Sequence, residues 1–253
     1  MNRTYIGVST KMYFGQARTL EWLDGIAGEI DARPRLDDLG VVPFVIPSFP
    51  LIPAALERLS PHGVMVGAQT VSWGDGALTG EVSAALLAEM GVSLVEIGHA
   101  ERRAHFGETA AVIARKVDAA LAVGMAPLLC VGEPSHGAIS AASDYCAEQV
   151  RASLGADPSR LESFIIAYEP VWAIGADRPA DADHINGVVT SVRSALARDL
   201  GVDETGIRIV YGGSAGAGLL GSLPAVDGLF LGRFAHDTTN FARVLDEAAE
   251  RGE

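Results

Sequence analysis

The sequence predicts an α/β protein built as one closed (β/α)8 barrel, and three observations carry this prediction. Short apolar runs recur eight times, stretches with helical periodicity separate most of them, and the length of 253 residues matches the size of such a barrel. Apolar strands that alternate with amphipathic helices indicate a parallel sheet covered by helices. No Pro/Gly/Ser-rich linker or sustained charge run divides residues 1–253, so we expect a single domain over that whole range.

The predicted strands are short runs of mainly apolar residues, as expected for strands that are buried on both faces. In chain order they are Tyr5–Val8, Val41–Ile46, Val64–Ala68, Leu94–Ile97, Ala126–Val131, Phe164–Ala167, Ile207–Tyr211 and Gly228–Leu231. Apolar residues spaced three or four apart predict helices between them, as in segments 20–30 and 112–121. An open doubly wound sheet usually needs fewer strands, and no Gly-x-Gly-x-x-Gly fingerprint follows the first run. A closed barrel is therefore favoured.

Composition excludes several classes of function. The net charge of −13, with scattered basic residues, argues against a nucleic-acid partner. No uninterrupted apolar stretch is long enough to span a membrane, and residues 1–15 lack the features of a secretory signal, so we expect a cytoplasmic protein. The two cysteines, Cys130 and Cys146, are expected to be reduced thiols.

Residues capable of chemistry follow the ends of the predicted strands. Lys11, His99 and Glu169 come shortly after the first, fourth and sixth runs. The other residues placed in this way are Gln69, Glu133, Gly212-Gly213-Ser214 and Gly232-Arg233, after the third, fifth, seventh and eighth runs. The carboxyl ends of barrel strands converge on the face that carries active sites, and a phosphate is usually held after strands seven and eight. The glycine-rich run to Gly218 predicts free amides leading towards a helix N-terminus.

Seven ordered motifs make the chain resemble the triosephosphate isomerase family over essentially its whole length. They are Lys11-Met12, Gly67-Ala68-Gln69, Leu78-Thr79-Gly80-Glu81, Ile97-Gly98-His99-x-Glu101-Arg102-Arg103, Cys130-Val131-Gly132-Glu133, Ala167-Tyr168-Glu169-Pro170-Val171-Trp172-Ala173-Ile174-Gly175 and Tyr211-Gly212-Gly213-Ser214. The resemblance implies the TIM barrel fold and an isomerase that moves a proton between adjacent carbons. It implies that Glu169 is the base and that His99, kept neutral at a helix N-terminus, polarises the carbonyl. Lys11, supported by Glu101, would stabilise the enediolate and the phosphate.

The same resemblance implies a lid and a phosphate site. Trp172 would anchor a lid over residues 170–180, Glu133 would be ion-paired or hydrogen-bonded beneath it, and the Gly175 amide would reach the phosphate of a small phosphorylated sugar. The remaining expected phosphate contacts are Gly212, Gly213, Ser214, Gly232 and Arg233. No cofactor is expected. The other histidines show no ligand spacing, so no metal is expected either; they are His62, His105, His136, His184 and His236.

Departures from the family pattern concern the substrate. Ser9-Thr10-Lys11-Met12-Tyr13 stands where the family usually has Asn-Trp-Lys-Met-Asn, and Ala100 replaces a serine. The lid tip is Ala176-Asp177-Arg178, and Gly232-Arg233 replaces paired glycines. Ser9 and Ala100 would enlarge the reacting end of the site.

This enlargement favours a four-carbon sugar phosphate. Since some proteins that resemble triosephosphate isomerase are erythrulose phosphate isomerases, the resemblance implies conversion of L-erythrulose 1-phosphate to D-erythrulose 4-phosphate. Ordinary triosephosphate isomerase, which converts glyceraldehyde 3-phosphate to dihydroxyacetone phosphate, is the alternative. A non-catalytic sugar-phosphate-binding barrel is disfavoured because a binder needs no base beside an electrophile, and the Glu169 segment disfavours an indole-pathway synthase.

The resemblance also implies a homodimer. The long loop over residues 72–80, with Asp75–Glu81 at the interface, would insert into a neighbouring subunit beside Lys11 and Glu101.

Overall fold

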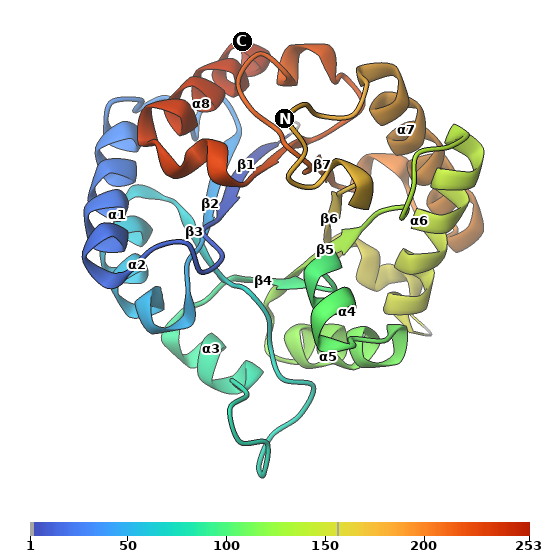
Figure 1. Cartoon of the computed structure of the whole chain (residues 1–253), viewed down its shortest axis with the longest axis horizontal. Helices are drawn as coiled ribbons and strands as arrows, with labels where there is room; N and C mark the ends of the chain where they lie inside the picture. Colours follow the sequence, from blue (N-terminus) through green and yellow to red (C-terminus); the bar gives the residue numbers. More distant parts are fainter. Residues whose placement is uncertain (1–2, 156) are drawn as a thin grey trace.

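The structure, a computed structural model, describes residues 3–155 and 157–253 and confirms the predicted barrel. Eight parallel strands close on themselves in chain order, and the helices form an outer ring around them (Figure 1). The strands are β1 (Thr4–Ser9), β2 (Val41–Ile46), β3 (Met65–Ala68), β4 (Leu94–Ile97), β5 (Ala126–Val131), β6 (Ile165–Tyr168), β7 (Ile209–Tyr211) and β8 (Gly228–Leu231). The closing pair is β1 with β8, in which Gly7 lies opposite Phe230.

Each observed strand overlaps its predicted run. The largest difference is at β7, which begins at Ile209 rather than at Ile207. The residues before it form a 3-10 turn, η5 (Glu204–Gly206), and the backbone N–H of Ile207 donates to Glu204 within that turn. Ile207 is therefore occupied in closing the turn and does not join the sheet.

Eight α-helices over the described residues cover the outside of the barrel. They are α1 (Gln16–Asp31), α2 (Ile52–Leu59), α3 (Ala84–Met90), α4 (Ala100–Phe106), α5 (Ala110–Ala122), α6 (Ile139–Leu154), α7 (Ala182–Leu200) and α8 (Thr238–Gly252). The helices predicted over 20–30 and 112–121 are α1 and α5, and each buries the central apolar residues of its periodic pattern, such as Leu23 and Ile26 in α1 and Ile113 and Val117 in α5. Among the described residues, no helix has the length and apolar character needed to cross a bilayer.

The helix expected after the glycine-rich run is very short. The glycine-rich run after β7 leads only to a three-residue 3-10 turn, η6 (Leu220–Ser222). Gly213 and Gly218 both have left-handed backbone conformations, with φ of 104° and 85°, which an α-helix does not accommodate. The short helix beside the strand ends is instead η7 (Arg233–His236), directly after β8.

The barrel interior is packed with side chains rather than open. A cluster separate from the larger core between strands and helices occupies it, and its buried members are Tyr5, Phe44, Ile46, Leu94, Leu128, Cys130, Ile165, Ala167, Val210 and Phe230. Successive strand residues point to opposite faces, so only every second residue of a strand faces this interior. The interior between the two ends of the barrel is therefore filled by the inward-facing side chains of this cluster.

Candidate active site

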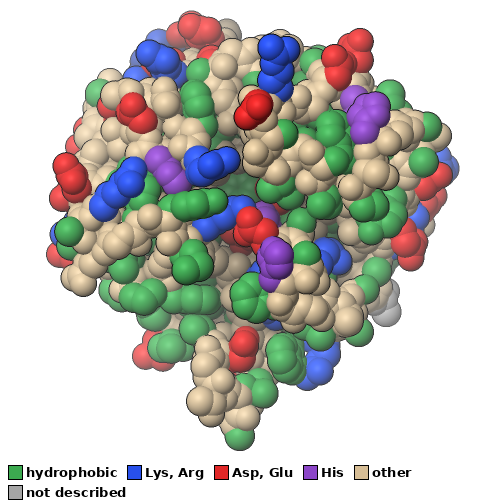
Figure 2. Space-filling view, viewed as in Figure 1, with side chains coloured by type: hydrophobic (Ala, Val, Ile, Leu, Met, Phe, Trp, Pro, Cys, Tyr) green, Lys and Arg blue, Asp and Glu red, His purple; other side chains and the backbone are tan. Residues whose placement is uncertain are grey.

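A cavity of about 700 Å³ lies at the carboxyl ends of the strands. Figure 2 shows acidic, basic and histidine side chains gathered around a hollow near the centre of this face. Ten residues singled out from the sequence line the cavity, namely Ser9, Lys11, His99, Glu101, Glu169, Gly175, Gly213, Ser214, Gly232 and Arg233. The fold thus brings together residues from both ends of the chain. Gly212, Glu133 and Trp172 are not among the lining residues.

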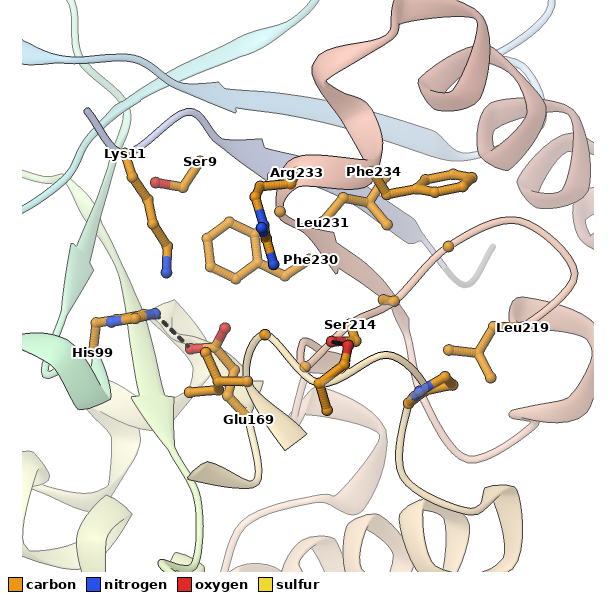
Figure 3. Close-up of a pocket in the computed structure, with 18 of the residues that line it drawn as sticks. Ser9, Lys11, His99, Glu169, Ser214, Leu219, Phe230, Leu231, Arg233 and Phe234 are labelled. Atoms are coloured by element: carbon orange, nitrogen blue, oxygen red, sulfur yellow. Dashed lines mark hydrogen bonds and ion pairs between the residues drawn. The ribbon is translucent and has the colours of Figure 1, made fainter. Parts of the chain in front are cut away.

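Glu169 follows β6 and presents a largely buried carboxyl group to His99. Its Oε2 atom lies 3.7 Å from His99 Nε2 (Figure 3) and has no hydrogen-bond partner among the described residues. Gly212 makes room for this side chain, because a Cβ atom there would lie 2.6 Å from Glu169 Oε1. The first glycine after β7 therefore helps to position the carboxyl group without lining the cavity.

His99 is held in one orientation by the helix that it begins. It is the N-cap of α4, and its Nδ1 atom accepts the backbone N–H of Glu101 at 3.1 Å. Since an accepting Nδ1 carries no proton, this hydrogen bond selects the neutral imidazole with its proton on Nε2. That donor faces Glu169 and the cavity. The local sequence therefore decides which imidazole nitrogen can serve as a hydrogen-bond donor to a ligand.

Lys11 is positioned by an unusual backbone conformation and by an ion pair. Its φ of 46° is left-handed, and its carbonyl oxygen accepts hydrogen bonds from Ser48 Oγ at 2.7 Å and Gln69 Nε2 at 2.8 Å. Its Nζ atom lies 2.6 Å from Glu101 Oε1. Burial by itself would lower the pKa of Lys11, but Glu101, together with the carboxyl groups of Glu169 and Glu96, outweighs it and the net effect is a raised pKa. A charged ammonium group thus faces the cavity, as Figure 3 shows.

The loops after β7 and β8 offer groups that suit an anion. Ser214 has a left-handed φ of 56°, and no hydrogen bond from its backbone N–H or that of Gly213 is found within the described residues. Arg233 is exposed and lines the same cavity at the start of η7. Free amides and a guanidinium group near Lys11 favour binding of a phosphate.

A buried carboxylate anchors the segment that follows Glu169. Glu133 Oε1 accepts hydrogen bonds from Trp172 Nε1 at 2.9 Å and from the Tyr168 hydroxyl at 3.2 Å. His184 Nε2 lies 3.2 Å from the same oxygen, an interaction that sequence analysis missed because the two residues are far apart in the chain. Glu133 and Trp172 therefore act on the start of the lid rather than on the cavity.

The rest of the lid segment, residues 171–180, is tied to the loop after β7. Ser214 Oγ lies within hydrogen-bonding distance of the carbonyl oxygens of Ala173 and Ala176, at 3.1 and 2.7 Å. The Tyr211 hydroxyl donates to Gly213 and accepts the Ala180 backbone N–H. The lid and the phosphate-type loop are thus one connected structure, which closes one side of the cavity.

Glu96, which sequence analysis did not single out, also lines the cavity. Burial raises its pKa to about 7, and the neighbouring His99 and Lys11 oppose this rise. The nearby carboxyl group of Glu169 adds to it. The signal in the sequence was a single acidic residue inside the apolar run Leu94–Ile97.

Comparisons with known proteins agree with this geometry. A family model described as triosephosphate isomerase matches residues 4–248. The chain is 47% identical to L-erythrulose-1-phosphate isomerase of Pectobacterium atrosepticum, over 96% of this chain and 95% of the relative. It is 38% identical to the protein of the same name from Mycolicibacterium smegmatis, over 97% and 93% of the two chains.

Triosephosphate isomerases are also similar. The one from Thermus thermophilus is 41% identical, over 79% of this chain and 83% of the relative. The crystal structure of triosephosphate isomerase from Bartonella henselae superimposes with a TM-score of 0.81 at 30% identity, covering 98% of this chain and 99% of that one.

Proposed function

Because the chain belongs to the triosephosphate isomerase family, we propose that it is a sugar-phosphate isomerase that moves a carbonyl group along a short phosphorylated ketose. The observation that carries the proposal is the buried Glu169 carboxyl group, 3.7 Å from the Nε2 atom of a neutral His99 and in one cavity with Lys11. A base beside an oriented donor and a cation is what proton abstraction next to a carbonyl group requires.

The reaction follows from these three groups. The Glu169 carboxylate removes a proton from the carbon next to the carbonyl, the C–H electron pair forms the carbon–carbon double bond, and negative charge moves to the carbonyl oxygen. The His99 Nε2–H group and the Lys11 ammonium group stabilise that oxygen. After the hydroxyl proton moves between the two oxygens, Glu169 returns its proton to the former carbonyl carbon. The carbonyl group has then moved by one position.

The phosphate and the lid serve this chemistry by holding the intermediate in place. Gly213, Ser214, Gly232 and Arg233 would bind the phosphate, with Gly175 contributing from the lid. A closed lid excludes water and reduces loss of the reactive enediolate. The hydrogen bond from Trp172 to Glu133 anchors the start of the lid, which supports a role of the lid in excluding water.

The substrate we propose is a four-carbon ketose phosphate, converted from L-erythrulose 1-phosphate to D-erythrulose 4-phosphate. Two findings support it: relatives at 47% and 38% identity carry the name L-erythrulose-1-phosphate isomerase, and the buried Ser9 lines the cavity. The small side chain of Ser9 leaves room next to the reacting carbon for the additional hydroxymethyl group. A three-carbon substrate would leave that space to water.

A coupled assay tests the choice of substrate. We expect kcat/KM for L-erythrulose 1-phosphate to exceed that for glyceraldehyde 3-phosphate by about tenfold to a few hundredfold, the range that one matched group supplies. Ser9→Asn should reduce the ratio between the two kcat/KM values, because the larger side chain obstructs the four-carbon substrate. Ser9→Ala keeps the space beside residue 9 and isolates the contribution of the hydroxyl group. Turnover of glyceraldehyde 3-phosphate near the diffusional limit, without turnover of erythrulose phosphates, would establish ordinary triosephosphate isomerase instead.

The proposal includes a homodimer. Met12 and Tyr13, directly after Lys11, are 89% and 55% exposed, and exposed large apolar side chains beside an active site are typical of a covered surface. The loop between β3 and α3 projects from the barrel (Figure 1), and a hydrogen bond from the Ser72 N–H to the Val82 carbonyl closes its base. Asp75–Glu81 lies in this projection, where it could reach the Lys11 side of a second copy.

Light scattering of the active enzyme should give the mass of two chains, because the apolar surface at Met12 and Tyr13 needs a covering partner. A tetramer built from such dimers would also agree with the proposal. An active particle with the mass of one chain contradicts it. We propose a cytoplasmic location because Cys130 and Cys146 are buried free thiols, which suits a reducing compartment.

A further inference from the structure

Glu96 and Ser9 face the inside of the barrel at the edge of the active-site cavity. On β4, Leu94 belongs to the inner cluster, and the strand period of two places Glu96 on the same face. On β1, Tyr5 belongs to that cluster, and the same alternation places Ser9 inward. Figure 3 shows Ser9 next to Lys11, on the side of the cavity where Phe230 lies. Both residues line the cavity.

The two polar groups lack close partners. Glu96 is 4% exposed, and within the described residues neither its Oε2 atom nor the Ser9 Oγ atom has a partner at normal hydrogen-bonding distance, although the Ser9 hydroxyl lies close enough to Glu96 to lower the pKa of its carboxyl group. Burying an unsatisfied carboxyl group is costly, so such a group calls for a partner that the protein itself does not provide. A ligand in the cavity is in a position to supply that partner.

The surrounding charges identify the kind of ligand. Lys11 is already paired with Glu101, and no ion pair involves Glu96 within the described residues. The carboxyl group of Glu169 would repel an anionic group placed between the two. No cluster of potential metal ligands is found in the described part of the chain. A neutral hydroxyl group, which can donate to the carboxylate without adding charge, is the ligand chemistry that fits.

We propose that Glu96 is a specificity-determining residue that accepts a hydrogen bond from the terminal hydroxyl group of a four-carbon substrate. The inference rests on the proposed function, because it assigns the fourth carbon of the substrate to the space that Ser9 and Glu96 share. A three-carbon sugar phosphate ends at the reacting carbon and leaves both polar groups without a ligand partner. Binding sites reject substrates that leave buried polar groups of the protein unpaired. This is the physical reason why Glu96 would favour the four-carbon over the three-carbon substrate.

The test compares three substrates: L-erythrulose 1-phosphate, its 4-deoxy analogue, which lacks only the terminal hydroxyl group, and glyceraldehyde 3-phosphate. In the wild type, we expect the analogue to react with a kcat/KM about 10- to 100-fold lower than the tetrulose, the range of a hydrogen bond to a charged group. Glu96→Leu, which suits the apolar interior, should lower kcat/KM for the tetrulose by a similar factor. It should change kcat/KM for the analogue and for the triose by less than about threefold.

Leu94→Met is the matched control, because it alters the same inner face of the same strand without touching a polar group. It should leave the ratio between tetrulose and analogue unchanged. Glu96→Gln keeps a hydrogen-bond acceptor, so its kcat/KM for the tetrulose should lie between the values of the wild type and of Glu96→Leu. Circular dichroism and thermal unfolding of each variant show whether the fold is retained.

The possible failures are distinct. If the wild type does not turn over L-erythrulose 1-phosphate, the proposed function fails and the inference fails with it. If the wild type does, but Glu96→Leu slows all three substrates equally, only the inference on Glu96 is overturned. Loss of turnover in Glu96→Gln to the level of Glu169→Gln on every substrate would instead place Glu96 in the proton-transfer chemistry, and this too contradicts a role in specificity.

Discussion

Glu169→Gln should fold normally and lose at least about 10²-fold in kcat, the low end of what a general base contributes. The amide keeps the shape of the carboxyl group in the space that Gly212 provides, but it cannot accept the proton from the substrate carbon. Steady-state assays with L-erythrulose 1-phosphate measure the loss, and KM should change little because the phosphate contacts remain.

Glu21→Gln is the matched control, since Glu21 is exposed on α1 and does not line the cavity. It makes the same chemical change without altering the site, so its kcat should equal that of the wild type. Near-normal turnover in Glu169→Gln, with the fold confirmed by circular dichroism, would remove the base from the proposed mechanism.

His99→Asn should lower kcat by about 10²- to 10³-fold, the typical effect of removing one donor that stabilises a developing oxyanion. Asparagine is a good N-cap, so it can still accept the Glu101 backbone N–H and preserve the start of α4. Its shorter side chain does not place a donor where His99 Nε2 lies. The variant therefore separates the structural role of His99 from its chemical role.

The measurement pairs kcat with the thermal unfolding midpoint. We expect a large fall in kcat with a midpoint close to that of the wild type. If kcat fell only in proportion to a loss of folded protein, His99 would be a capping residue without a part in the chemistry.

Much of the fold was predictable because its signals are local. Each apolar run and each periodic segment is a property of neighbouring residues, and parallel strands must end on the same face of a barrel. For this reason Lys11, His99 and Glu169 could be placed in one site although they are far apart in the chain. The glycine-rich run after β7 does lead to a helix start, but local composition did not specify that it is a 3-10 turn of three residues.

The sequence by itself determined the barrel, the order of its strands and the strand ends that carry the proposed base and electrophile, since these depend on short-range periodicity. Only the tertiary structure decided that His184 shares the carboxylate of Glu133, that Gly212 makes room for Glu169, and that Glu96 has an unpartnered oxygen at the cavity. Burial and hydrogen-bond partners depend on which distant residues meet in space. A single acidic residue in an apolar strand, such as Glu96, indicates a buried charge-bearing group. Whether that group has hydrogen-bond partners is decided only by the residues that surround it in the closed barrel.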